Sequence, residues 1–144
     1  MKVDKCGGGY CVHGMEYFFC WSVISEIWTG GLKLDIGPGL YMGHVHGITL
    51  NPKVKIGKNC NIHKGVTNGQ ENRGKRKGVP VIGDEVWIGI NATIVGNIHI
   101  GNDVLIAPGA YINFDVPDHS IVVGNPGVIR HAVHATDGYI NRKV

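Results

Sequence analysis

Two histidines separated by a single residue, His44 and His46, are the side chains here whose chemistry is easiest to define. They lie in the segment MGHVHG. An imidazole with an unperturbed pKa of about 6.5 exchanges a proton near neutral pH and can act as a general base. In an extended segment, alternation would place both rings on the same side. The pair is therefore compatible with a general base, a metal-binding pair or a solvated surface.

A basic segment is the second candidate for chemistry. Four cations, Arg73, Lys75, Arg76 and Lys77, fall within five residues of a segment that runs from position 68 to position 79. Such a group clamps phosphate anions or forms a solvated loop. The glycines among these residues permit a ligand to approach the backbone closely.

A metal centre is not expected. A catalytic zinc ion normally has three protein ligands, and the histidines do not supply a convincing set. His131 and His134 are three residues apart, but they lie beyond the repetitive part of the chain.

The elements that position these residues follow a six-residue repeat. A parallel β-helix produces this period, because each repeat is one short strand plus a corner. One apolar residue of each unit points inward, and a second, small or β-branched residue follows four positions later. The first series is Ile82, Ile88, Ile94, Ile100, Ile106 and Ile112, and the second is Val86, Ala92, Ile98, Val104, Ala110 and Val116.

The repeat extends upstream with two irregularities. Leu50, Ile56 and Ile62 keep the six-residue step, and Ile36, Met42 and Ile48 keep it two residues out of phase. The phase slip lies between Met42 and Leu50 and contains the two histidines. The second break, from about residue 68 to residue 80, is the basic segment, which we expect to be an ejected loop. Irregular segments of a regular scaffold are where sites are usually built.

These patterns predict an all-β chain with three parts. Residues 1–34 form a tail and a helix over 14–28 that caps the first coil or, alternatively, contacts another subunit. Residues 35–130 form the β-helix domain, and residues 131–144 form a C-terminal tail. Gly124-Asn125-Pro126 predicts a turn, followed by a short helical stretch to about Ala135 and a loose end.

Composition excludes several partners. The formal net charge of +3 is too small to indicate nucleic-acid binding. No signal peptide or membrane span is recognisable, so we expect a cytoplasmic protein that does not bind membranes. Cys60 falls on an inward ladder position, which predicts a buried free thiol.

The repeat, the segment Ile36–His44 (IGPGLYMGH) and the ending VGNPG at 123–127 resemble the hexapeptide-repeat acyltransferases, and most of all the serine O-acetyltransferases. The resemblance covers about residues 35–130. It implies a left-handed coil, a homotrimer with active sites between subunits, and acetyl-CoA as cosubstrate lying along that groove.

The resemblance also implies roles for individual residues. The catalytic base maps onto His44, and His46 is assigned to substrate contact or support. Gly69 falls near the thioester, where a backbone N–H would stabilise the oxyanion. The backbone at Gly89 and Ala107 falls where the pantetheine arm runs, and the basic loop would hold the CoA phosphates.

The chain departs from the family pattern at groups that hold the base and the amino acid. Gly43 stands where an Asp precedes the catalytic His, and Gly78-Val79-Pro80 stands where a second active-site His precedes Pro. The Asp that orients the base falls on Thr29 when counted back without gaps.

Substitutes and alternatives follow from these departures. His46 is a candidate for one missing group, and Glu26 and Asp35 are candidates to orient His44. The predicted acceptor is the hydroxyl of L-serine, with a sugar hydroxyl as the alternative. A non-enzymatic β-helix scaffold is the second alternative; it would not need two outward histidines or an ejected basic loop.

Overall fold

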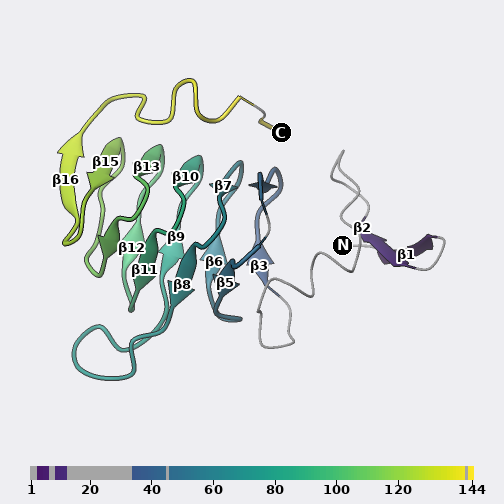
Figure 1. Ribbon diagram of the computed structural model, residues 1–144, viewed down its shortest axis with the longest axis horizontal. Helices are drawn as coiled ribbons and strands as arrows, with labels where there is room; N and C mark the ends of the chain where they lie inside the picture. The colour runs from purple at the N-terminus through teal and green to yellow at the C-terminus, as the bar shows by residue number, and fades with distance from the viewer. Residues whose placement is uncertain (1–2, 7–8, 13–33, 45, 142) are drawn as a thin grey trace.

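The computed structural model describes residues 3–6, 9–12, 34–44, 46–141 and 143–144. From position 34 onward the chain winds into a left-handed parallel β-helix with three faces (Figure 1). This confirms the predicted fold class. The described residues form no α-helix, and the helix predicted over 14–28 lies outside them. Within the predicted N-terminal tail, β1 (Val3–Cys6) and β2 (Gly9–Val12) pair antiparallel.

Each face of the coil is a sheet of very short strands from successive turns. Face I contains β3 (Asp35–Ile36), β6 (Lys55–Ile56), β9 (Val81–Ile82) and β12 (His99–Ile100). Face II contains β4 (Tyr41–Met42), β7 (Asn61–Ile62), β10 (Val86–Ile88), β13 (Val104–Ile106), β15 (Ser120–Val123) and β16 (Val128–His131). Face III contains β5 (Thr49–Leu50), β8 (Thr67–Gly69), β11 (Thr93–Val95) and β14 (Tyr111–Ile112).

The inward positions form the continuous core that the six-residue repeat predicts. Ile62, Ile88 and Ile106 lie in register on face II, and the ladder isoleucines from Ile82 to Ile112 are all buried. Cys60 is buried as a free thiol, as predicted. Burial raises its pKa to about 11, so it stays protonated at neutral pH.

Strand register locates the phase slip within one corner. Leu50 pairs with Asn68, 18 residues on, which is the three-hexad turn of the coil. Met42 pairs with Ile62, 20 residues on. The first turn therefore contains two additional residues between β4 and β5, as the sequence predicts.

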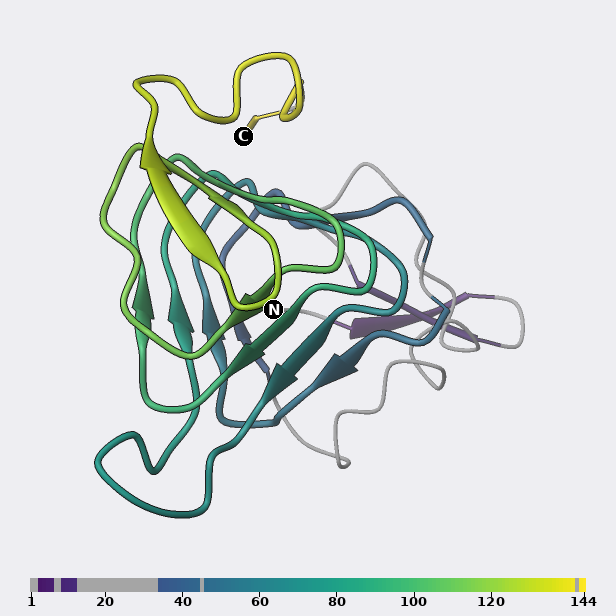
Figure 2. The same cartoon turned by 60° about the vertical axis from the view of Figure 1, so that its left-hand side comes forward.

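The second irregularity begins slightly later than predicted. Asn68 and Gly69 belong to β8, so the ejected loop comprises residues 70–78 and is closed by an antiparallel bridge between Glu71 and Gly78. It extends away from the coil (Figure 2). Asn68 obscured this boundary because it is a polar residue at an inward position, in register between Leu50 and Ile94. Its amide is buried and has no hydrogen-bond partner among the described residues, which is destabilising.

The chain after the last turn differs from the sequence-based expectation. The turn at 124–127 is confirmed, but β16 follows it as an antiparallel partner of β15, so the predicted helical stretch is wrong for 128–131. The free sheet edge of β15 offers backbone hydrogen-bond partners to an added strand, whereas an isolated short helix is only marginally stable in water. The subsequent residues, which we call the C-terminal segment (132–141 and 143–144), return along face II toward the first turns (Figure 1).

Side chains of the β-helix hold the C-terminal segment in place. Asn61 Nδ2 donates to the Tyr139 carbonyl (3.1 Å), and Asn59 Oδ1 accepts from the Val144 N–H (2.9 Å). Asp103 Oδ1 accepts from the N–H and the hydroxyl of Thr136 (3.0 and 2.7 Å). Asp103 Oδ2 accepts from Ala135 N–H (3.1 Å) and lies 2.8 Å from His119 Nδ1. The end of the described chain is therefore fastened rather than loose.

Replacing Asp103 by Asn should loosen the C-terminal segment. Burial alone would raise the pKa of Asp103, but its hydrogen bonds from His119, Thr136 and Ala135 prevail and lower the pKa from 3.8 to about 2. A depressed folded-state pKa stabilises the fold above about pH 4, and this contribution is lost as the pH falls toward 2. The side-chain amide of Asn would also direct an N–H group at the N–H and O–H groups that donate to Asp103. We expect Asp103→Asn to lower the free energy of unfolding by about 1–3 kcal/mol at pH 7.

Urea unfolding at pH 7 and at pH 2.5 measures this effect. The difference in the free energy of unfolding between the wild-type and the variant should be smaller at pH 2.5 than at pH 7. Asp137→Asn, at an exposed position of the same segment, is the control and should leave stability unchanged. Equal stability of Asp103→Asn and the wild-type at pH 7 would contradict the role given to Asp103.

Candidate active site

His44 lies in the widened corner between faces II and III of the first turn. His46 occupies the same corner position as Lys64 in the next turn. The His46 carbonyl accepts from Gly65 N–H (3.2 Å), and the Lys64 carbonyl accepts in the same way from Asn91 N–H. Gly43 is level with His63, since Met42 pairs with Ile62. The two additional residues of this turn are thus His44 and its successor, and the His44 side chain is exposed.

The alternation argument for the two histidines is wrong. His46 lies in a turn rather than in an extended strand, so no strand periodicity places the two rings on one side. Both side chains are nevertheless exposed at the same corner. The corner is widened because the two-residue insertion has to be accommodated between strands whose register is fixed by the core.

Residues of later turns extend this corner into a column. Gly43, His63, Gly89 and Ala107 each follow the inward residue of face II in successive turns. A Cβ at Gly89 would lie 2.6 Å from Pro108 N and 2.9 Å from the Ile106 carbonyl oxygen, so only glycine fits there. The two residues assigned to the pantetheine arm, Gly89 and Ala107, therefore share an edge with His44.

His63 is a residue of this column that the sequence analysis missed. Its ring lies 4.7 Å from the Trp87 ring, and Trp87 lies 5.0 Å from the ring of Tyr139. Burial, and then the charge of His44, lower the pKa of His63 below 6.5. The sequence signal that could have identified His63 is a histidine at a position that glycine or alanine occupies in the other turns.

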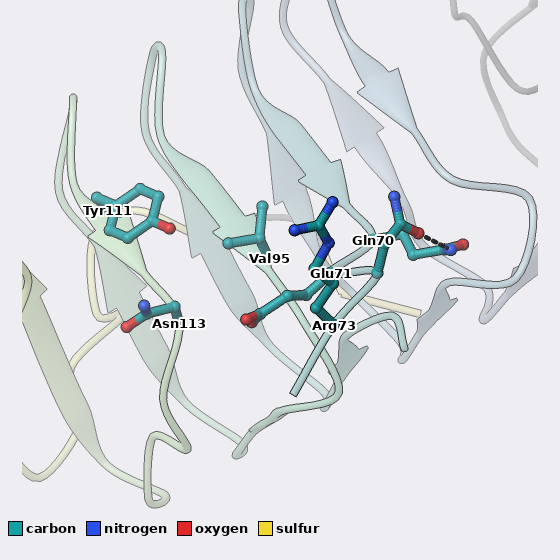
Figure 3. Close-up of a pocket in the computed structure, with 7 residues that line it drawn as sticks. Gln70, Glu71, Arg73, Val95, Tyr111 and Asn113 are labelled. Atoms are coloured by element: carbon teal, nitrogen blue, oxygen red, sulfur yellow. Dashed lines mark hydrogen bonds between the residues drawn. The ribbon is translucent and has the colours of Figure 1, made fainter. Parts of the chain in front are cut away.

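An open cavity of about 450 Å³ lies at the other end of face III, beneath the ejected loop (Figure 3). Val95 and Tyr111 line it from neighbouring strands, and Arg73 lines it from the loop. Gly69, the last residue of β8, is in register with Val95, so the position assigned to the thioester lies beside this cavity. The remaining lining residues are Gln70, Glu71, Asn72 and Asn113.

The four cations of the loop are not equivalent. Arg76 Nε lies 3.2 Å from Glu71 Oε2, so the charge of Arg76 is partly neutralised. Arg73, Lys75 and Lys77 are exposed, and Arg73 borders the cavity. The loop therefore presents positive charge mainly through these three side chains.

The candidate residues form two groups that a single chain keeps apart. The corner with His44, His46, Gly89 and Ala107 precedes the strands of face III, whereas Gly69 is the last residue of β8 and the basic loop follows it. Asp35, a candidate to orient His44, lies on face I, where its carboxylate is 3.6 Å from Lys55 Nζ. That role for Asp35 is therefore not supported. Glu26, the other candidate, lies outside the described residues.

The described residues hold no group of three His, Cys, Asp or Glu side chains arranged to bind a metal ion. In the same part of the chain, no helix is long and apolar enough to cross a membrane.

Comparison with known proteins identifies relatives for this architecture. Residues 80–113 match the family model described as "Bacterial transferase hexapeptide (six repeats)". A serine acetyltransferase of Bacillus subtilis is 31% identical over 124 residues, which are 82% of this chain and 57% of that protein. A serine acetyltransferase of Staphylococcus aureus is 37% identical over 114 residues, covering 75% and 52% of the two chains. The chain thus spans about half the length of these relatives.

Solved structures give the same result. The serine acetyltransferase of Neisseria gonorrhoeae in complex with serine superposes with a TM-score of 0.61 and 39% identity, covering 67% of this chain and 39% of that one. The soybean serine acetyltransferase gives a TM-score of 0.62 and 37% identity, over 67% and 40% of the chains. The chain accordingly has a hexapeptide-repeat β-helix that is similar to the β-helix of the serine O-acetyltransferases.

Proposed function

We propose that this protein transfers the acetyl group of acetyl-CoA to the hydroxyl of L-serine, with His44 as general base. The observation that carries the proposal is the two-residue insertion that exposes His44 at one corner of a β-helix similar to serine acetyltransferases. A scaffold would not require an exposed histidine in an inserted corner. One of the similar structures is a complex with serine, which favours this acceptor over a sugar.

The proposed reaction is a direct transfer. His44 accepts the proton of the acceptor hydroxyl as that oxygen attacks the thioester carbonyl. The tetrahedral intermediate collapses by breaking the carbon–sulfur bond, and the CoA thiolate takes the proton back from the imidazolium. A backbone N–H near Gly69 is proposed to donate to the oxyanion; loss of one such donor typically costs about 10²–10³ in rate.

We further propose that the active site forms between subunits of a homotrimer. The support is the separation of the two candidate groups by the strands of face III. If the corner of one subunit packs against the cavity and basic loop of the next, His44 is brought to the thioester. In this arrangement Gly89 and Ala107 border the pantetheine arm, and Arg73, Lys75 and Lys77 approach the phosphates.

Separate replacement of the two histidines tests the catalytic assignment. A positioned base contributes about 10²–10⁴ to rate, so His44→Ala should lower kcat by about this factor and leave the KM for acetyl-CoA nearly unchanged. His46→Ala should mainly raise the KM for the acceptor. Turnover is measured as thiol release from acetyl-CoA with serine, homoserine and sugars as acceptors.

Melting temperatures serve as the control and should not change, because both side chains are exposed. Full turnover in His44→Ala together with loss of turnover in His46→Ala would reverse the two roles. Acetylation of sugars alone would refute serine as the acceptor.

Removing the positive charge of the loop tests the phosphate contact. A variant with Gln at Arg73, Lys75 and Lys77 should raise the KM for acetyl-CoA roughly three- to hundredfold at low salt, since exposed ion pairs contribute about 0.2–1 kcal/mol each. The effect should shrink as salt rises, because exposed charges are screened within about 10 Å at 0.1 M. Arg76→Gln should have a smaller effect, because Arg76 already pairs with Glu71.

Gln at Lys55, Lys58 and Arg130 makes the same change of charge elsewhere on the surface and should leave the KM unchanged. A parental KM in the loop variant at low salt would show that the basic loop is only solvated surface.

Subunit mixing tests whether the site is shared. The His44→Ala and loop-Gln variants are each expected to be impaired. After they are unfolded together and refolded, some trimers should pair an intact corner with an intact loop across one interface. Activity at low acetyl-CoA should therefore exceed the average of the two variants refolded separately. If co-refolding gives no gain in activity, the shared site is contradicted. So it is if light scattering shows that the fully active protein is a monomer.

A further inference from the structure

His63 differs from the other members of its column because it brings a titratable ring to the corner that carries His44. Gly43 lies level with it in the previous turn, and a Cβ at Gly43 would be 3.5 Å from His63 Cε1 and Nδ1. Since His44 directly follows Gly43, the backbone places the two imidazoles in adjacent turns of one corner. The missing side chain at Gly43 leaves space beside Cε1 and Nδ1 of the His63 ring.

The His63 ring is held in one position by aromatic contacts. Trp87 packs against it with an interplanar angle of 51°, and Tyr139 packs edge-on against Trp87 with an interplanar angle of 64°. Tyr139 belongs to the C-terminal segment, where Asn61 binds its carbonyl. A fixed ring of this kind can orient a mobile partner, because its own rotamer is already determined by packing.

One nitrogen of this fixed ring has no partner. Nε2 of His63 is buried and makes no hydrogen bond with any described residue. A buried polar atom without a partner is destabilising, and a hydrogen bond from a neighbouring group would remove that cost. With the proton on Nδ1, Nε2 is an acceptor. Burial and the His44 charge both lower the pKa of His63 and keep the ring neutral.

We propose that His63 is the positioning residue for His44: in the reacting complex its Nε2 accepts a hydrogen bond from the ring N–H of His44. This inference rests on the proposed function. It gives the general base an orienting acceptor, a role that Asp35 does not fill because it lies on another face and is paired with Lys55. Among the described residues, His44 is the group whose charge acts on His63, and Tyr139 reaches it only through Trp87.

Two replacements of similar size separate positioning from packing. His63→Leu retains a side chain that packs against Trp87 but removes the acceptor, whereas His63→Gln retains a carbonyl acceptor. We expect His63→Leu to lower kcat by about ten- to a hundredfold, as part of the 10²–10⁴ contributed by a positioned base. His63→Gln should recover most of the lost turnover. The KM for acetyl-CoA and the melting temperature should change little in either variant.

The control is His99→Leu, at an exposed position of β12 on face I, and it should keep parental kcat. Parental kcat in His63→Leu would overturn the proposal. So would equal losses in the Leu and Gln variants, because they would show that the acceptor atom is irrelevant.

A titration followed by ¹⁵N NMR tests the pairing without any assay of activity. In the wild-type protein the pKa of His63 should lie below 6.5, and in His44→Gln it should rise, because the neighbouring positive charge is gone. An unchanged pKa of His63 would show that the two rings do not interact and would overturn the proposal. Absence of acetyl transfer by the wild-type with every acceptor would instead refute the proposed function, and the titration would still decide whether the rings interact.

Discussion

The stacking of inward aliphatic side chains from turn to turn is the constraint on which the rest of this structure depends. Each turn of 18 residues places three such side chains on those of the turn below. Since a shift by one residue would turn every inward side chain outward, the register of each strand is fixed by burial. Departures from the repeat cannot be absorbed within the strands. They are expelled at corners, where backbone and side chains reach solvent.

Both groups of candidate residues originate in this way. The two-residue insertion widens one corner and exposes His44, and the loop of residues 70–78 leaves the coil at the opposite end of face III and covers a cavity. The core thus sets how far apart the two groups are within a chain. In the proposed homotrimer a neighbouring subunit brings the two groups together, so the proposed assembly and the proposed chemistry depend on each other.

The C-terminal segment links the outer surface of face II to the same corner. Its attachment through Asp103 and Asn61 places Tyr139 against Trp87, and Trp87 against His63. Hydrogen bonds that serve stability thereby also fix a ring next to the candidate base. Residues far apart in sequence, near positions 63, 87 and 139, contribute to one small region because parallel turns stack at a constant register.

The sequence by itself determined the β-helix, its phase slip and its ejected loop, because burial with a period of six leaves a regular mark on residue types. The role of His44 in that phase slip stays a prediction. It did not reveal that Asn68 is inward, since a polar residue at a core position looks like a break. It also did not predict β16 or the attachment of the C-terminal segment, whose partners Asp103, Asn61 and Asn59 are distant along the chain. Only the tertiary structure decided that His63 lies in the turn next to that of His44, because this placement arises from stacking between turns and leaves no local pattern.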